Sequence, residues 1–309
     1  MNKVIVITGP TAVGKTSLSI ELAKKYDGEI INADSTQVYK TLDIATAKIT
    51  EKEKEGIPHY LIDIKNIDEN YTVYDYQKDA RKCIDDILKR GKTPILVGGT
   101  GLYIKAALYD YKFNLETTKG DYSKYTKEEL YNMLLKLDPD TTIHINNRKR
   151  VERRLDYIKN NHTTETNKTD KLLYDAIFIG LTIDRDILYD RINKRVDIMI
   201  KNGLVEEAKR IYDSNIRTKA VLTPIGYKEL FLFFDSAISL NEAIELIKQR
   251  SRRYAKKQYT WFNNQMKINW FNTNYEDFNK TVEEIKEFIG GNLWHHIMKQ
   301  KKGKLQKQF

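Results

Sequence analysis

Residues 4–16 read Val4-Ile5-Val6-Ile7-Thr8-Gly9-Pro10-Thr11-Ala12-Val13-Gly14-Lys15-Thr16, and this stretch decides the fold. Its first five residues are a continuous β-branched run, which is typical of a strand covered on both faces in a parallel sheet. The remainder matches Gly-x4-Gly-Lys-Thr, the pattern of a phosphate-binding P-loop. Apolar residues at helical spacing follow from Leu18 to Tyr26, and Gly28 is predicted to end that helix. Strand, glycine loop and helix are the context that the P-loop pattern requires.

The loop residues have the chemistry to hold a diphosphate or a polyphosphate. Backbone N–H groups between the glycines can surround phosphate oxygens, and the start of the helix adds positive potential. Lys15 can neutralise the oxygens, and Thr16 can hold Mg²⁺. The residues expected to bind the phosphate group are Gly9, Pro10, Thr11, Ala12, Val13, Gly14, Lys15 and Thr16.

Further alternation of strands and helices predicts an α/β fold, with a parallel sheet flanked by helices. Strands are expected at residues 29–33, 93–97 and 174–182, and helices at residues 72–90, 102–108, 187–200 and 241–262. Residues 111–173 are polar, lysine-rich and mostly helical in pattern. We therefore expect a discontinuous core of residues 1–110 and 174–295, a helical insertion of residues 111–173, and a basic tail of residues 296–309.

Composition limits the class of protein. The 309 residues carry a formal net charge of +10, so an acidic partner is plausible. A lone cysteine, Cys83, excludes a disulfide within the chain and lies on the apolar face of its predicted helix, which indicates a core residue. No apolar run approaches the roughly 18 residues of a membrane span. A cytoplasmic monomer without a membrane anchor is expected.

Several polar residues allow two interpretations each. Asp34 follows the second predicted strand, where open parallel sheets bind ligands, and could hold Mg²⁺, accept a proton or cap the next turn. Arg191 and Arg195 are one helical turn apart on the predicted helix. They could form ion pairs on the protein surface, or they could clamp a diphosphate. Two cationic runs, residues 149–154 and 248–257, suit either nucleic acid or a solvated helix face.

An ordered series of motifs over residues 3–265 resembles the tRNA dimethylallyltransferase family. Beside the P-loop, the motifs lie at residues 32–39, 44–48, 97–103, 143–151, 225–229 and 254–262. The resemblance implies transfer of a dimethylallyl group from dimethylallyl diphosphate to N6 of adenine 37, next to the tRNA anticodon, giving N6-(dimethylallyl)adenosine and diphosphate. It also implies Mg²⁺ held by Thr16, a donor in the P-loop, and an insertion that grips the anticodon stem.

The resemblance assigns roles to particular residues. Asp34 matches the general base, and Arg195 matches an arginine that contacts the diphosphate. The implied catalytic residues are Asp34, Lys15, Thr16, Thr100 and Arg195. The implied tRNA contacts are Asp34, Ser35, Thr36, Gln37, Thr100, Lys149, Arg150, Arg153, Tyr227, Lys228, Arg253, Lys256, Lys257, Gln258 and Trp261. The chain departs from the family pattern at Thr223-Pro224, at Lys257 and at Asn263.

Three other functions use parts of the same pattern. A P-loop kinase would use Asp34 to activate a hydroxyl and would need ATP, but the strand at residues 93–97 ends in Gly98-Gly99-Thr100 and lacks the acid that such enzymes use for Mg²⁺. An adenylate isopentenyltransferase would use a free nucleotide, against which the cationic runs argue. An RNA-binding protein without catalysis would not need Asp34, Lys15 and Thr16 together.

Overall fold

The computed structural model describes residues 3–113, 119–160 and 171–305, and the chain divides into two compact units. Residues 1–109 and 172–309 form the larger unit, and residues 110–171 form the smaller one. The chain therefore leaves the larger unit once and returns to it. Residues 306–309 of the expected basic tail lie outside the described residues.

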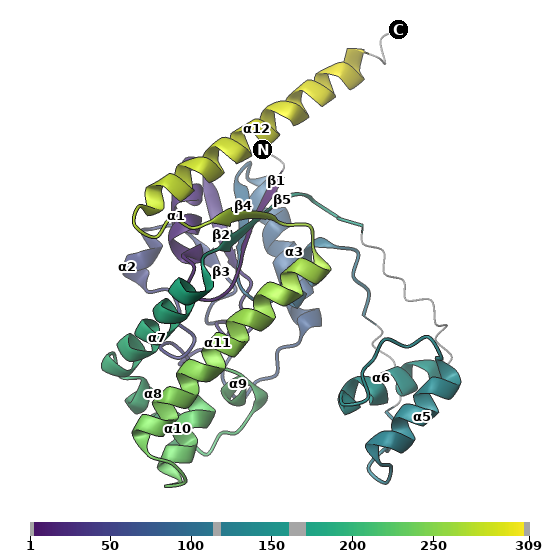
Figure 1. Cartoon of the computed structure of the whole chain (residues 1–309). Helices are drawn as coiled ribbons and strands as arrows, with labels where there is room; N and C mark the ends of the chain where they lie inside the picture. Colours follow the sequence, from purple (N-terminus) through teal and green to yellow (C-terminus); the bar gives the residue numbers. More distant parts are fainter. Residues whose placement is uncertain (1–2, 114–118, 161–170, 306–309) are drawn as a thin grey trace. The chain divides into compact units, whose positions relative to one another are not determined.

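The larger unit is built on one parallel sheet (Figure 1). Its described strands are β1 (Lys3–Thr8), β2 (Gly28–Asn32), β3 (His59–Tyr60), β4 (Thr93–Val97), β5 (Asp175–Thr182) and β6 (Asn269–Asn272). Their order across the sheet is β3-β2-β4-β1-β5-β6, and every neighbouring pair is parallel. The predicted parallel sheet flanked by helices is confirmed. Because the strands run in one direction, the ends of β1, β2 and β4 meet at one edge, where open parallel sheets bind ligands.

Alternate residues of β1 enter two different apolar clusters. Val4 and Val6 belong to one cluster, and Ile5 and Ile7 belong to the other; all four are fully buried. This alternation places one cluster on each face of the sheet, as the continuous apolar run of β1 predicts. Cys83 packs against the first cluster, where burial raises the pKa of its thiol to about 11, so it is a structural residue.

Helices cover both faces of the sheet. The helices α1 (Lys15–Lys25) and α12 (Phe278–Leu305) supply residues to the cluster of Ile5 and Ile7, while α3 (Val73–Lys89) and α4 (Gly101–Leu108) supply residues to the cluster of Val4 and Val6. The remaining described helices of this unit are α2 (Glu51–Lys54), α7 (Arg185–Lys201), α8 (Leu204–Asp213), α9 (Lys219–Leu222), α10 (Tyr227–Phe234) and α11 (Leu240–Gln265). Both α7 and α11 contribute buried residues to both clusters.

The smaller unit contains the helices α5 (Lys127–Leu137) and α6 (Arg148–Lys159). They enclose an apolar cluster of their own, made of Tyr122, Leu130, Leu134, Val151 and Leu155. Arg154 ties the two helices together through an ion pair with Asp138, with the nitrogen and oxygen 2.7 Å apart. A separate core and internal ion pairs define this unit as a small helical insertion.

One local prediction is wrong, and the structure adds two features that the sequence did not predict. Gly28 does not end α1: the helix ends at Lys25, and Gly28 is the first residue of β2, where a Cβ would lie 2.6 Å from Cδ1 of Ile95. Residues 269–272 pair with β5 as an edge strand, which the sequence pattern did not predict. The backbone of α12 continues to Leu305, so most of the expected tail belongs to a helix.

Candidate active site

The loop between β1 and α1 has a shape that requires glycine at both ends. Gly9 has φ +135°, and a Cβ there would lie 2.4 Å from the carbonyl oxygen of Leu181. Gly14 caps α1 with φ +100°, and a Cβ would lie 2.8 Å from the ring of Phe278. These φ values are ones that side chains disfavour. The loop therefore presents the first N–H groups of α1 as an anion site.

The ammonium of Lys15 folds back onto this loop. It donates to the carbonyl oxygens of Gly9 at 3.0 Å and Pro10 at 2.7 Å. Burial, together with the positive charge of Arg195, lowers the pKa of Lys15 to about 7, although the charge of Asp34 acts in the opposite direction. An anion bound here would restore the ammonium charge.

Two arginines of α7 reach the same loop. Arg195 donates to the hydroxyl of Thr11 at 3.2 Å, and Arg191 donates through Nε to the carbonyl oxygen of Ala12 at 2.7 Å. The guanidinium of Arg191 lies 4.1 Å from the ring centroid of Tyr275. Burial lowers the pKa of Arg195, opposed by the charge of Asp34. Both side chains contact the loop of residues 9–16, and neither forms an ion pair with an acidic residue in the described parts of the chain.

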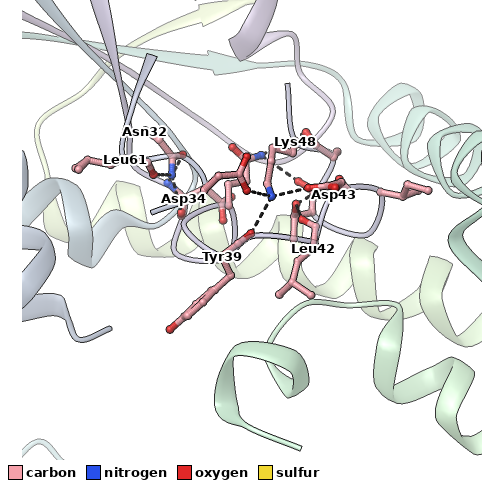
Figure 2. Close-up of polar contacts among 12 residues, drawn as sticks. Asn32, Asp34, Tyr39, Leu42, Asp43, Lys48 and Leu61 are labelled. Atoms are coloured by element: carbon pink, nitrogen blue, oxygen red, sulfur yellow. Dashed lines mark hydrogen bonds and ion pairs between the residues drawn. The ribbon is translucent and has the colours of Figure 1, made fainter. Parts of the chain in front are cut away.

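Asp34 stands at the end of β2 on a framework that fixes its backbone. The buried Asn32 donates to the carbonyl oxygens of Asp34 at 3.0 Å and Leu61 at 2.9 Å, and accepts from Asp34 N at 2.9 Å (Figure 2). One carboxylate oxygen of Asp34 accepts from both the N–H and the hydroxyl of Thr36, at 2.9 and 2.7 Å. Asp34 thus caps the turn with one oxygen, and its second oxygen has no donor among the described residues.

Thr100 joins the ends of β2 and β4. Its hydroxyl accepts from Ser35 N at 3.0 Å, and its own N–H donates to Ala33 at 3.1 Å. The ends of β2 and β4 can approach this closely because Gly98 has no side chain. A Cβ at Gly98 would lie 2.2 Å from the carbonyl group of Ala33. Thr100 and Ser35 are therefore held beside Asp34.

Gln258, which the family resemblance implies as a tRNA contact, lines the cavity and also has a structural role. Its side chain is buried, and it accepts from Thr11 N at 3.0 Å and donates to Gly99 O at 3.1 Å. Gln258 therefore ties α11 to the phosphate loop and to the end of β4. A glutamine that directly follows a cationic run gives no sign of this role, since both of its partners lie more than 150 residues away.

These elements enclose one cavity of about 530 Å³. Of the expected site residues it is lined by Thr11, Ala12, Gly14, Lys15, Thr16, Asp34, Ser35, Thr36, Gln37, Arg195 and Gln258. Tyr254 and Tyr275 also line it, and sequence reasoning gave them no role in this cavity. A second cavity of about 720 Å³ shares Thr16, Ala47 and Arg195 with the first. The phosphate loop and the carboxylate thus face a common space.

The cationic run on α11 separates into paired and unpaired charges. Lys248 pairs with Asp197 at 2.8 Å, Arg250 pairs with the buried Glu229, and Arg252 donates to Asn193. The run's other three cations, Arg253, Lys256 and Lys257, are exposed and contact no acidic group in the described parts of the chain. This second group forms the exposed cationic face of α11.

The other expected tRNA contacts have different environments. Lys228 is exposed at the start of α10, but the neighbouring Tyr227 is fully buried and its hydroxyl donates to Glu207 at 2.7 Å. Tyr227 is therefore a correction to the sequence-based expectation, because its side chain is not available to a ligand. Trp261 is half-buried against Gly101, where a Cβ would lie 2.0 Å from the indole.

In the smaller unit, Lys149, Arg150 and Arg153 are exposed on α6 without ion pairs to described residues. Arg148 and Arg154, in contrast, are paired with Glu152 and Asp138. The unpaired cations leave one face of α6 free for an anionic partner.

The fold is α/β, and its cavity has a glycine loop with Lys15 on one wall and the carboxylate of Asp34 on another, an arrangement typical of an enzyme that acts on a phosphorylated substrate. The family model described as IPP transferase matches residues 37–265. The tRNA dimethylallyltransferases of Anoxybacillus flavithermus and Macrococcus caseolyticus are 50% and 48% identical, over 94% and 95% of this chain and 96% and 97% of theirs. The chain belongs to the IPP transferase family and is a transferase.

Solved structures of the same family are also similar to this chain. The full-length tRNA isopentenylpyrophosphate transferase of Bacillus halodurans is 45% identical, covers 96% of this chain and 98% of its own, and superposes with a TM-score of 0.75. A eukaryotic dimethylallyltransferase described as acting on tRNA is 32% identical over 96% of this chain and 80% of its own, with a TM-score of 0.84. None of the helices in the described ranges is both long and apolar enough to span a bilayer.

Proposed function

We propose that this protein transfers a dimethylallyl group from dimethylallyl diphosphate to N6 of adenosine 37 in tRNA. The observation that carries the proposal is one cavity lined by the phosphate loop, by Arg195 and by Asp34. The relatives named tRNA dimethylallyltransferase support the choice of substrates. A diphosphate held by the loop and a base held beside Asp34 would share that space.

The diphosphate end of the donor binds the loop of residues 9–16. Lys15 and the first N–H groups of α1 contact its oxygens, and Arg195 contacts them from α7. In the reaction the allylic C–O bond breaks and its electron pair leaves with the diphosphate. Lys15 and Arg195 stabilise the charge that develops there, and as fixed charges they do not need to reorganise during the step.

Asp34 acts on the acceptor. The exocyclic amine of adenine is a poor nucleophile, because its lone pair is delocalised into the ring. As the new C–N bond forms, the amine loses a proton to the carboxylate oxygen of Asp34 that is not used by Thr36. Thr100 and Ser35 keep the neighbouring backbone in place. The adenine must leave its stack to reach this position.

Mg²⁺ fits the residues present. Thr16 is exposed in the first turn of α1 and lines both cavities. The described residues contain no group of three or more His, Cys, Asp or Glu side chains that could hold a metal by themselves. Such a donor set suits Mg²⁺, which commonly takes one or two protein ligands and completes its shell with substrate phosphates and water. When bound, the ion supplies neutralisation of diphosphate charge, and Thr16 would hold it.

The RNA is proposed to bind two groups of unpaired cations. These are the exposed cationic face of α11 and, on the smaller unit, Lys149, Arg150 and Arg153. Cations without protein partners can pair with phosphates without first breaking an ion pair. We propose that the smaller unit contacts the anticodon stem. Lys257 supplies charge here without the bidentate fork of an arginine.

A transfer assay tests the proposal. Purified protein, Mg²⁺ and dimethylallyl diphosphate should modify an anticodon stem-loop with adenosine at position 37, and should leave a matched stem-loop with guanosine there unmodified. Prenylation of free AMP at a similar rate would instead identify an adenylate isopentenyltransferase. RNA-independent consumption of ATP without prenyl transfer would identify a kinase.

A further inference from the structure

Residues 42–48 form a loop that lies on one wall of the cavity through Ala45, Thr46 and Ala47. The side chain of Gln37 is hydrogen-bonded to this loop. Its Nε2 donates to Thr46 O at 3.0 Å and to Ala47 O at 3.3 Å. Both partners are carbonyl groups, so they fix which end of the amide faces the loop. The amide oxygen of Gln37 has no partner among the described residues and is the atom left for a ligand.

Glu207 of α8 holds this loop from outside the cavity. The residue is 2% exposed. One carboxylate oxygen accepts from Asp43 N at 3.1 Å and Ile44 N at 2.9 Å, and the other accepts from Ala45 N at 3.1 Å. The hydroxyl of Tyr227 donates to that second oxygen at 2.7 Å. Three successive N–H groups and one hydroxyl thus converge on one buried carboxylate.

Lys48 holds the other end of the same loop (Figure 2). Its ammonium donates to Tyr39 O at 2.8 Å and pairs with Asp43 at 2.6 Å and Asp63 at 2.5 Å. Lys48 therefore links the loop to the segment that follows Gln37. With both ends held, the carbonyl groups of residues 46 and 47 have little freedom to move.

We infer that Glu207 is a positioning residue for the acceptor base, acting through the loop of residues 42–48 and the amide of Gln37. The inference rests on the proposed function for the identity of the acceptor. Glu207 lines neither cavity, and none of its described contacts is with the phosphate loop. Its loss should weaken use of the RNA and spare binding of the diphosphate.

A carboxylate is the side chain that this position requires. Both of its oxygens accept, so it can satisfy three N–H groups and a hydroxyl together. Glutamine has the same shape but only one accepting oxygen, and its NH₂ group would face the N–H groups of Asp43 and Ile44 or that of Ala45. In either orientation at least one buried N–H loses its partner. The loop would then shift to find water.

The test compares Glu207→Gln with Glu29→Gln. Glu29 is also 2% exposed and is held by Arg90 and Tyr60, but it does not line the cavity. We expect Glu207→Gln to lower kcat/KM for the stem-loop by about 10- to 100-fold, the effect of a displacement near 1 Å in a reacting group. KM for the donor should stay within about twofold of the wild-type value, because neither substitution changes a residue that contacts the donor. Glu29→Gln should leave both parameters unchanged.

Two further measurements keep the inference open to refutation. Tyr227→Phe removes one of the four groups that donate to Glu207 and should lower kcat/KM for the stem-loop by a few-fold, so it tests the inference if Glu207→Gln does not fold. Amide exchange at residues 43–45, measured without substrates, should be faster in Glu207→Gln and unchanged in Glu29→Gln. This exchange result does not depend on the proposed function.

Equal losses toward donor and RNA in Glu207→Gln, or unaltered exchange at residues 43–45, would overturn the inference. Wild-type kinetics toward the stem-loop in both Glu207→Gln and Tyr227→Phe would overturn it as well. A wild-type protein that modifies no RNA would refute the proposed function instead.

Discussion

Binding of the donor diphosphate should draw a proton onto Lys15. In the free protein, burial and the nearby guanidinium of Arg195 together lower the pKa of this ammonium to about 7. At about pH 8, only about one molecule in ten then carries the charge. A diphosphate about 4 Å away, at an effective dielectric constant near 20, favours the charged form by about 4 kcal/mol, or about three pKa units. Binding at about pH 8 should therefore take up about 0.9 proton, and at about pH 6 about 0.1.

Calorimetry measures this uptake directly. The donor is titrated into the protein in two buffers with different enthalpies of ionisation, and the difference in heat gives the number of protons. The affinity should fall by about tenfold for each pH unit between about pH 7 and pH 10. Lys15→Met removes the titrating group and keeps a side chain of similar length, so its uptake at about pH 8 should be close to zero. Arg195→Ala removes a repulsive charge and should shift the uptake to higher pH.

The lowered pKa of Lys15 also determines whether this residue makes the protein more or less stable as the pH rises. Lys15 binds its proton less tightly in the folded protein, at a pKa of about 7, than in the unfolded chain, near 10.5. Between these pH values the unfolded chain binds more protons than the folded protein, so the free energy of unfolding increases as the pH rises.

A wild-type protein that takes up no proton on donor binding at about pH 8, or a Lys15→Met protein with the same uptake as wild type, would refute the prediction of proton uptake.

Three more predictions follow from the site. Asp34→Asn should lower kcat by about 10²- to 10⁴-fold while the calorimetric donor affinity changes little, because it removes a proton acceptor; wild-type turnover would exclude Asp34 as the base. Gln258→Ala should weaken donor binding by about tenfold, because it leaves Thr11 N and Gly99 O without their partner; calorimetry with an unchanged affinity would contradict this. Arg253→Ala should reduce the salt slope of RNA binding by about 1, whereas Lys24→Ala, which removes an exposed cation already paired with Glu55, should not change it. Equal slopes for Arg253→Ala and wild type, from filter binding at several salt concentrations, would make that face of α11 a solvated one.

The parts of the fold that the sequence predicts are those with local signals. The β-branched run of β1 and the glycines of the loop are each specified within a few residues, and the structure contains both. Gly28 was misread because a glycine after a helical pattern resembles a helix end. Its actual constraint is the side chain of Ile95, which lies on another strand.

The residues that the sequence could not place are those whose role depends on distant partners. Tyr227 and Gln258 lie within motifs that also contain exposed cations, and only tertiary packing separates the buried side chains from the exposed ones. Glu207 carries no signal at all, because its three N–H partners lie about 160 residues earlier in the chain. The carboxylate at the end of β2 was easier to find, since the carboxyl end of a parallel strand is a known place for ligands.

The most direct test of the central claim is a transfer experiment with radiolabelled dimethylallyl diphosphate and two stem-loops that differ only at position 37. We predict label on N6 of adenosine 37, no label on the guanosine stem-loop, and loss of transfer in Asp34→Asn despite intact donor binding. Equal labelling of both stem-loops, or transfer by Asp34→Asn at the wild-type rate, would contradict the claim that the cavity joins a diphosphate site to an adenine site through this carboxylate.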